Sequence, residues 1–371
     1  MGKVISAGHI CLDITPVFRP ESRCAEIGEL LVPGKLIQMG PASVHTGGSV
    51  ANTGLALKLL GNDVTLLGKV GADAFGGMAR QIAAEYGAGG LIVDPEGSTS
   101  YSVVLAVPGI DRIFLHNPGA NDTFSAADIP EAALDGAQLF HFGYPPLMRR
   151  MYENGGAELR DMLRAVRARG VATSLDLAAV DPTSDAGRAD WRAILAAALP
   201  CVDFFVPSFE ELCYMLDRPR WDALSARGGD MTARLDLARD AAPLAEACLA
   251  MGCGAVLVKC GVSGMLYRTA ARGRIAEIGP RLALDEGLWA DAAGEQPCFR
   301  AEIVRSGTGA GDVSIAAFLT AVMDGEPPAE CARLAAAEGA ASVSSYDALG
   351  GILPMDELKR RIAAGWETME G

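Results

Sequence analysis

The chain has 371 residues, and its 46 acidic residues outnumber its 32 lysines and arginines, which gives a formal net charge of −14. Hydrophobic residues make up 50% of the sequence and charged residues 21%, a composition typical of globular proteins and not of disordered chains. The acidic balance, with no lysine- or arginine-rich run, argues against nucleic-acid partners, because recognition of a phosphate backbone needs a concentrated basic surface. We therefore expect a globular protein that acts on small molecules.

The sequence also argues against secretion, membrane insertion and a metal centre built from histidine or cysteine. The first residues lack the apolar core of a signal peptide. No uninterrupted apolar run approaches the roughly 18 residues of a membrane span. The nine cysteines include no C-x-x-C pair, which predicts reduced and mostly buried thiols. The four histidines all precede residue 142. These features predict a cytoplasmic protein that binds neither membranes nor nucleic acids.

Short apolar segments alternate with amphipathic segments along most of the chain. Continuous apolar runs are typical of strands buried on both faces, and amphipathic runs are typical of the helices that cover them. The expected strands are 3–7, 64–70, 138–143, 171–177, 204–207 and 255–259. The expected helices are 49–60, 76–86, 157–169, 191–199, 237–251 and 313–322. This order predicts an α/β layered fold around a mainly parallel sheet.

Two regions interrupt this alternation. Residues 12–46 contain few helix signals, and the pattern of residues 98–118 predicts a β-hairpin with its turn at 108–111. Strands inserted between α/β units predict a small accessory sheet, which we expect to cover the mouth of the main sheet as a lid. Residues 217–236 and 281–300 are rich in Arg, Asp and Gly and are expected to be surface excursions.

A glycine-rich string, SGTGAGD at 306–312, directly precedes the helix expected at 313–322. Glycines let a backbone approach a ligand closely, and the N–H groups at a helix N-terminus suit a phosphate or a developing oxyanion. Asp312 falls in the first turn of the helix, where a carboxylate can accept a proton from a substrate hydroxyl. An N-cap in a tight turn would give the same string. Neither a Walker-type nor a dinucleotide-binding glycine pattern is present.

A second glycine-rich string, TGGSVAN at 46–52, opens the helix expected at 49–60. The side chain of Asn52 both donates and accepts hydrogen bonds, which suits recognition of a polyol. An ordinary helix start explains this string equally well on its own. His9, His45 and His116 lie in or near the expected lid, and Tyr144 follows an expected strand. For each of these four, contact with a ligand and simple packing both remain open.

Together, the two strings give the chain a resemblance to the PfkB-type carbohydrate kinases, the ribokinase-like family, over nearly its whole length. The first family signature is similar to Gly47, Gly48 and Asn52 followed by Gly61 and Gly71, and the second resembles TGAGD at 308–312. Both occur in the family's order. Asp13 matches the family's substrate-hydroxyl aspartate, and GAN at 119–121 resembles a segment of many members.

The resemblance implies a ribokinase-like three-layer αβα fold with a mainly parallel central sheet. It implies one kinase domain over 1–371, with lid segments at approximately 12–46 and 98–118. The implied activity is ATP-dependent phosphorylation of a hydroxyl on a small sugar or sugar-like acceptor. Asp312 would be the general base, and the backbone N–H groups of Gly309, Ala310 and Gly311 would form the anion hole. The residues implied in acceptor binding are Asp13, Gly47, Gly48, Asn52 and Asn121.

The family also implies ATP and Mg²⁺ as cofactors and a homodimer formed through the lid. KCGVSG at 259–264 resembles the nucleotide-binding turn, and Glu211 corresponds to a glutamate that holds Mg²⁺ through water. The residues implied in nucleotide binding are Lys259, Gly261, Gly264, Ser208 and Thr308.

Three departures from the family pattern accompany these matches. Ser208 replaces the usual Asn beside Glu211, Asp176-Leu177-Ala178 lacks a usual Asn, and Ser306-Gly307 replaces an Asp-Thr or Asp-Pro pair. In the family, the aspartate of the pair that Ser306-Gly307 replaces is linked to monovalent-cation binding, so potassium activation is left open. Two alternatives also stay open: a nucleoside kinase on the same fold, and a catalytically weakened sugar or nucleotide sensor.

Overall fold

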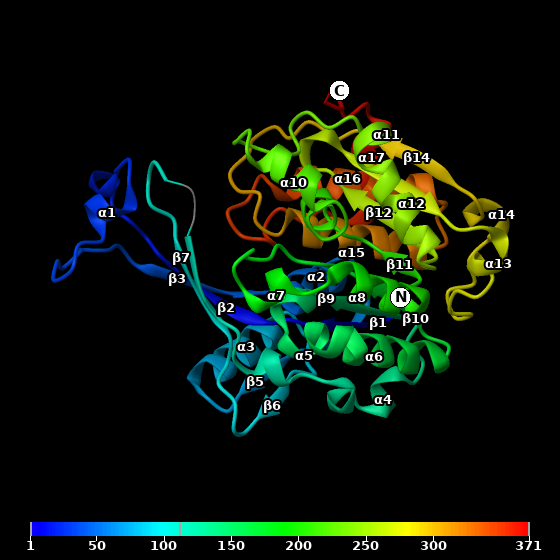
Figure 1. Cartoon of the computed structure of the whole chain (residues 1–371), viewed down its shortest axis with the longest axis horizontal. Coiled ribbons are helices and arrows are strands. Elements are labelled where there is room, and N and C mark those ends of the chain that lie inside the picture. Colours follow the sequence, from blue (N-terminus) through cyan, green and yellow to red (C-terminus); the bar gives the residue numbers. More distant parts are fainter. Residues whose placement is uncertain (1, 111–112, 370–371) are drawn as a thin grey trace.

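The computed structural model describes residues 2–110 and 113–369, and Asp111 of the expected hairpin turn lies outside these residues (Figure 1). Its largest sheet has the strand order β14-β13-β12-β11-β10-β9-β1-β4. Strands β4, β1, β9, β10, β11 and β12 run parallel, while β13 is antiparallel to both of its neighbours. The strands are β1 (Lys3–Gly8), β4 (Asp63–Leu67), β9 (Leu139–Gly143), β10 (Ala172–Leu175), β11 (Phe204–Phe205), β12 (Ala255–Lys259), β13 (Met265–Thr269) and β14 (Ala293–Gln296). The predicted mainly parallel α/β sheet is confirmed.

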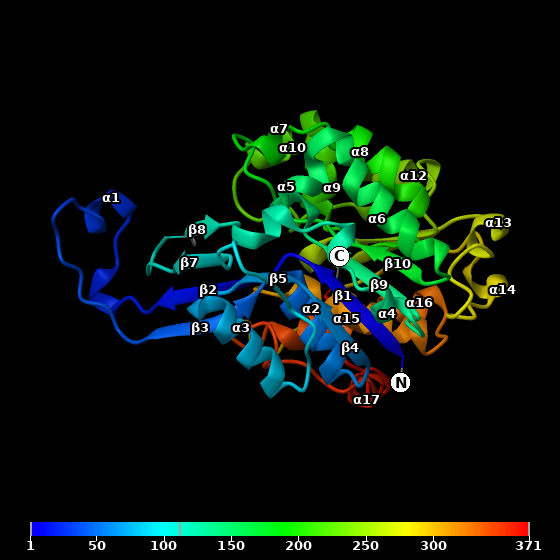
Figure 2. The same ribbon diagram turned by 90° about the horizontal axis from the view of Figure 1, so that it is seen from below.

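Helices cover both faces of this sheet, which gives three layers (Figure 2). One face carries α2 (Ser49–Leu59), α3 (Ala74–Glu85), α15 (Ala310–Met323), α16 (Pro328–Ser342) and α17 (Met355–Ala363). The other face carries α6 (Ala157–Ala168), α8 (Trp191–Ala198), α9 (Phe209–Leu216), α11 (Leu237–Asp240) and α12 (Ala242–Ala250). Shorter helices are α1 (Ile27–Leu30), α4 (Glu131–Leu134), α5 (Arg149–Tyr152), α7 (Asp185–Arg188), α10 (Arg218–Ser225), α13 (Arg272–Ile275) and α14 (Glu286–Trp289).

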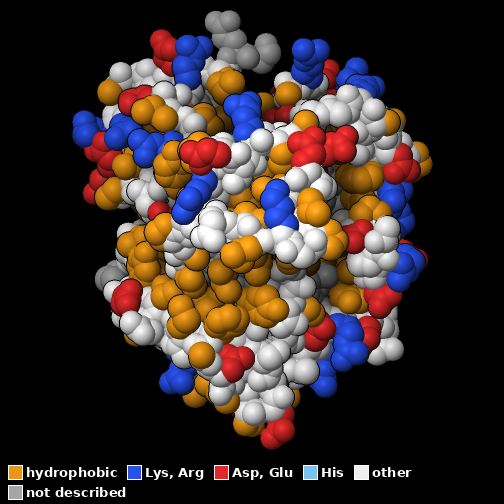
Figure 3. Space-filling view, turned by 90° about the vertical axis from the view of Figure 1, so that its left-hand side faces the viewer, with side chains coloured by type: hydrophobic (Ala, Val, Ile, Leu, Met, Phe, Trp, Pro, Cys, Tyr) orange, Lys and Arg blue, Asp and Glu red, His pale blue; other side chains and the backbone are white. Residues whose placement is uncertain are grey.

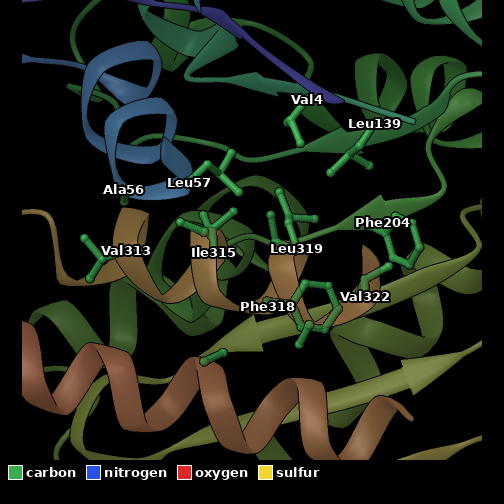
Figure 4. Packing of buried hydrophobic residues seen from close by; sticks show 14 of the residues in the cluster. Val4, Ala56, Leu57, Leu139, Phe204, Val313, Ile315, Phe318, Leu319 and Val322 are labelled. Carbon is green, nitrogen blue, oxygen red and sulfur yellow. The ribbon is translucent and has the colours of Figure 1, made fainter. Parts of the chain in front are cut away.

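Side chains of the central strands alternate between two cores, as expected for strands buried on both faces. Val4, Leu139 and Phe204 join the core on the α15 side, whereas their sequence neighbours Ile5, Phe140 and Phe205 join the opposite one. Figure 4 shows Val4 and Leu139 above Ile315 and Leu319 of α15, with Phe204 farther along the helix, where its ring contacts that of Phe318. Helix α15 is buried from Asp312 to Val322, because it lies between the sheet, α2 and α16. Its first turn therefore sets Asp312 inside the protein.

A small sheet of order β3-β2-β7-β8 projects from the main body (Figures 1 and 2). Its strands are β2 (Cys11–Pro16), β3 (Ala42–Gly47), β7 (Tyr101–Leu105) and β8 (Ile113–Asn117). They come from the two segments that interrupt the α/β alternation, so the expected accessory sheet is confirmed. A further pair, β5 (Lys69–Gly71) and β6 (Ile92–Asp94), lies apart from both sheets.

Three expected elements differ from the structure. The expected strand 64–70 leaves the main sheet at Gly68, where a Cβ atom would lie 2.6 Å from the Ile10 side chain. The expected helix 237–251 divides into α11 and α12, because Pro243 has no N–H group to continue one helix. The expected surface excursion 281–300 instead supplies the edge strand β14 and the buried Trp289.

Strand β1 is the point in the main sheet from which the chain builds outward in both directions. From β1 the chain continues to β4 on one side, and it later returns to β9 on the other side. In open parallel sheets, ligands bind beyond the carboxyl ends of the strands at such a point, where the strand order reverses. The residues that follow β1 and β9 are His9 and Tyr144. No helix in the described part of the chain combines the length and hydropathy that a membrane crossing needs.

Candidate functional site

The carboxylate of Asp312 receives hydrogen bonds from three side chains. The amide of Asn52 donates to Oδ2 over 3.0 Å, and the hydroxyl of Thr53 donates to Oδ1 over 3.1 Å. The phenol of Tyr144 lies 2.9 Å from Oδ1 and 2.8 Å from Oδ2. Asp312 is only 4% exposed. The first turns of α2 and α15 and the end of β9 therefore meet at one carboxylate.

The start of α15 is shaped by glycine. Gly309, the N-cap, has φ +75°, and a Cβ atom there would lie 2.3 Å from Cβ of Ala348. This left-handed conformation is one that glycine adopts without strain. A Cβ atom on Gly311 would lie 3.7 Å from Nζ of Lys259, so the ammonium group borders the loop. The helix N-terminus and Lys259 together favour an anion at this point. Ala310 is the first residue of α15, and Thr308 is exposed just before it.

Lys259 forms a buried ion pair with Asp176. Its Nζ lies 2.9 Å from Oδ1 of Asp176, and both side chains are at most 10% exposed. Burial raises the pKa of Asp176, whereas the charge of Lys259 acts in the opposite direction, and the nearby Glu211 and Asp312 raise it further. Lys259 thus faces acidic groups on one side and the glycine loop on the other.

Ser208 and Glu211 form a capping box at the start of α9. The hydroxyl of Ser208 accepts a hydrogen bond from the N–H group of Glu211, and Oε2 of Glu211 accepts one from the N–H group of Ser208. Ser208 also forms an isolated bridge with Lys259. Ser208 was expected to contact the nucleotide, and its hydroxyl is occupied here by the helix cap.

The expected nucleotide turn follows β12 directly. Gly261 has φ +54° and lies against Thr232, and Gly264 has φ +97° and lies against the backbone carbonyl of Gln296. The hydroxyl of Ser263 donates to the carbonyl of Thr232 and accepts from the N–H group of Leu235. Residues 217–236, expected to be only a surface excursion, thus support the turn.

Asp13, Gly47 and Gly48 lie where the small sheet meets the main sheet. A Cβ atom on Gly47 would lie 2.2 Å from Oδ2 of Asp13, and one on Gly48 would lie 2.6 Å from Nδ1 of His9. Burial raises the pKa of Asp13, whereas hydrogen bonds from Cys11 and Ser102 lower it. Both glycines therefore allow the backbone to approach polar side chains closely.

Asn121 differs from the expectation. Its amide nitrogen donates to the carbonyls of Ile10 and Pro118, and its oxygen accepts from the N–H group of Ile10. The side chain is fully buried. All three contacts are to backbone, so Asn121 fixes the segment after β1 instead of presenting its amide to a ligand.

His9 lies in the same region with neither ring nitrogen hydrogen-bonded to any described residue. The side chain is 2% exposed, and burial lowers its pKa to about 3, with a further contribution from His116. Its ring centroid lies 5.3 Å from that of His116 and 6.2 Å from that of Tyr144. A neutral imidazole here can pair with a polar ligand.

Several of these contacts could not be found in the sequence motifs. Thr53 follows the motif residue Asn52, but its contact depends on how α2 crosses α15. Tyr144 is signalled only by its place at the end of a parallel strand. In the described residues, no group of three or more His, Cys, Asp or Glu side chains is arranged to hold a metal ion.

A family profile described as "pfkB family carbohydrate kinase" matches residues 2–354. Fructokinase-1 from Oryza sativa subsp. japonica is 28% identical over 145 residues, which cover 38% of this chain and 41% of that relative. The chain thus aligns with less than half the length of this relative.

Solved structures with similar folds match over almost the full length. The fructokinase with bound ATP from Xylella fastidiosa has a TM-score of 0.71 at 20% identity, covering 98% of this chain and 99% of that one. The nucleoside kinase of Methanocaldococcus jannaschii has a TM-score of 0.64 at 19% identity, with the same coverage. At these identities the likeness shows the ribokinase-like fold.

Proposed function

Because the chain belongs to the pfkB family of carbohydrate kinases, we propose that it transfers the terminal phosphoryl group of ATP to a hydroxyl of a small sugar or sugar-like acceptor. One observation carries the proposal: a buried carboxylate, Asp312, lies in the first turn of a helix that begins with a glycine loop and borders Lys259. A base and an anion site therefore lie side by side, as phosphoryl transfer to a hydroxyl requires.

In the proposed mechanism, Asp312 accepts the proton of the acceptor hydroxyl as the oxygen of that hydroxyl attacks the terminal phosphorus. Asn52 and Thr53 hold the carboxylate in place. The N–H groups at Gly309, Ala310 and Gly311, together with Lys259, stabilise the negative charge on the transferring group. Asp13, Gly47, Gly48 and Asn52 orient the acceptor, and Asn121 supports them through the backbone of Ile10.

The residues present fit ATP with a hydrated Mg²⁺ ion. Glu211 is half-buried, its charge raises the pKa of both Asp176 and Tyr144, and its carboxylate already caps α9, so it would reach the ion through water. When bound, Mg²⁺ neutralises charge on the phosphates, and it commonly keeps several waters. Gly261, Gly264, Ser208 and Thr308 would border the nucleotide. Ser306 and Gly307 supply no carboxylate, so we assign no monovalent-cation site.

The test is release of ADP over a panel of monosaccharides, sugar acids and nucleosides, using the wild-type chain and Asp312→Asn. Asp312→Asn keeps the side chain's size but removes the base, so we expect turnover to fall by about 10²- to 10⁴-fold. Asp324→Asn at the exposed C-cap of the same helix is the matched control and should keep wild-type turnover.

Near-normal turnover by Asp312→Asn would remove Asp312 from the role of base. Turnover confined to nucleosides would favour the nucleoside kinase. Calorimetry that detects sugar or nucleotide binding without phosphoryl transfer by the wild type would favour the sensor.

We also propose that two copies pair through the small sheet, which then acts as the lid. Figure 3 shows hydrophobic side chains gathered on the face at this end of the molecule. On the small sheet and its connections, Val17, Leu36 and Leu115 are 48%, 84% and 54% exposed. The nine free thiols fit the cytoplasmic location that we propose. Light scattering measures the oligomeric state.

A further inference from the structure

The hydroxyl of Tyr144 is hydrogen-bonded to both carboxylate oxygens of Asp312. It lies within 2.9 Å of both oxygens, while Asn52 and Thr53 each reach only one. An acceptor hydroxyl that gives its proton to Asp312 must donate a hydrogen bond to one of these same oxygens. The phenol and the acceptor hydroxyl therefore require the same carboxylate.

The backbone at Tyr144 is strained in a way that places the phenol on Asp312. Its φ of 63° and ψ of 42° lie in the left-handed region, which large side chains rarely adopt. The next residue is Pro145, which normally holds the preceding residue in extended conformations. Strain of this kind persists where surrounding contacts enforce it, and it gathers at functional sites. The bonds to Asp312 are such contacts.

The surroundings of Tyr144 suit a polar ligand. Tyr144 and His9 follow β9 and β1 at the reversal of strand order, where ligands bind in folds of this kind. Both ring nitrogens of the buried His9 are unpaired within the described chain, although the phenol ring is only 6.2 Å away. Burial and the charge of Asp312 raise the pKa of Tyr144, so its phenol stays protonated as a donor.

We propose that Tyr144 is an internal hydroxyl that occupies Asp312 until an acceptor displaces it, and so keeps water from reacting in the acceptor's place. This inference rests on the proposed kinase function, and it explains how the site would favour the acceptor hydroxyl over water as the group that attacks ATP. A polyhydroxyl acceptor replaces the phenol at Asp312 and offers partners to His9. A single water molecule replaces only one of these contacts, so it displaces the phenol poorly.

The reaction that Tyr144 suppresses is the hydrolysis of ATP. In that reaction the oxygen of water bonds to the terminal phosphorus, and the bond from that phosphorus to the bridging oxygen of ADP breaks. The water gives one proton to Asp312, which releases it to solvent, and the products are ADP and inorganic phosphate. Removing only the hydroxyl of Tyr144 should leave Asp312 open to water.

The experiment compares wild type, Tyr144→Phe and Tyr214→Phe. Tyr214 is the matched control, because its partly buried hydroxyl donates to the carbonyl of Gly187 and not to Asp312. With ATP and no acceptor, we expect Tyr144→Phe to release phosphate about five-fold faster or more, and the acceptor KM to fall. Tyr214→Phe should match wild type in both measurements. Unchanged hydrolysis with a lower kcat at unchanged KM would overturn the proposal, since that pattern indicates a positioning role.

A double-mutant cycle separates this inference from the proposed function. Thermal midpoints of wild type, Tyr144→Phe, Asp312→Asn and the double variant are compared without any turnover. Because the two side chains are hydrogen-bonded, we expect the midpoint shifts to be non-additive. Additive shifts would overturn the inference even if the wild type is a kinase. Non-additive shifts with no ATP turnover by any variant would overturn the proposed function, and with it this role of Tyr144.

Discussion

Lys259 and Asp312 carry charge into the interior at the point where parallel strands end, and each is held by polar partners. Lys259 pairs with Asp176, and Asp312 accepts three side-chain hydrogen bonds. Burying charges costs several kcal/mol even when they are paired, so such clusters are poor devices for stability. Their concentration around the glycine loop is what the proposed anion binding and proton transfer would need.

Glu338 on α16 is a buried carboxyl group whose ionisation should make stability depend on pH. It is fully buried, and burial raises its pKa to about 8, although the N–H group of Leu353 donates to it. The folded state then holds a proton that the unfolded state loses above about pH 4.5. Stability from Glu338 is therefore greatest below that pH and declines as pH rises to about 8, by up to about 1.4 kcal/mol per pH unit.

Glu338→Gln removes this ionisation and keeps an oxygen for Leu353. Chemical denaturation between pH 4.5 and 9 should therefore show the wild type losing stability relative to Glu338→Gln as pH rises. Parallel curves for the two proteins across this range would contradict the prediction.

Single residues were predictable from sequence where a motif fixes both residue type and backbone. Each of the two glycine-rich strings opens a helix, and the side chains of Asn52 and Asp312 at these helix starts are hydrogen-bonded to each other. Lys259 borders the loop that precedes Asp312. Asn121 was expected to bind the acceptor but contacts backbone, and the contact of Tyr144 with Asp312 was not expected. The contact of Tyr144 with Asp312 depends on a left-handed backbone before proline, and the contacts of Asn121 include a backbone 111 residues away.

At the scale of elements, the start of α9 depends on the side chain of Ser208, which caps the helix. Ser208→Ala removes the hydroxyl that accepts from Glu211, so we expect it to lower the free energy of unfolding by about 1 kcal/mol. Ser208→Asn keeps a good N-cap and should remain within a few tenths of a kcal/mol of wild type. Urea denaturation of the three proteins measures both values. A stability of Ser208→Ala equal to that of Ser208→Asn would show that the capping box contributes nothing.

The order and type of the elements that were expected follow from hydrophobic pattern, because a strand buried on both faces and an amphipathic helix differ in periodicity, whereas β13, α16 and α17 were not expected. Their ends follow less well. Strand β4 ends just before Gly68, where Ile10 leaves no room for a side chain, and Pro243 divides a helix whose pattern continues across it. Strand β14 was missed because its side chains are exposed or half-buried at the sheet edge, so no continuous apolar run marks it.

At the scale of the whole molecule, the net charge of −14 contrasts with the anion site that the proposed kinase function requires. Local groups offset the global charge: the N-terminus of α15 and the ammonium group of Lys259 lie within the acidic protein. A helix N-terminus acts over only about one turn. The net charge therefore favours solubility, while binding of phosphate depends on the arrangement of a few residues.

The exposed apolar side chains of the small sheet should control assembly. Leu115 lies on the edge strand β8 and is 54% exposed. In a dimer formed through this sheet, Leu115→Glu would bury a carboxylate without a partner, so we expect light scattering to show a shift from dimer to monomer. Leu59→Glu is the matched control, because Leu59 is 44% exposed at the end of α2 on the main body. A monomeric wild type, or a Leu115→Glu variant that stays dimeric at the same concentrations, would remove the small sheet as the interface.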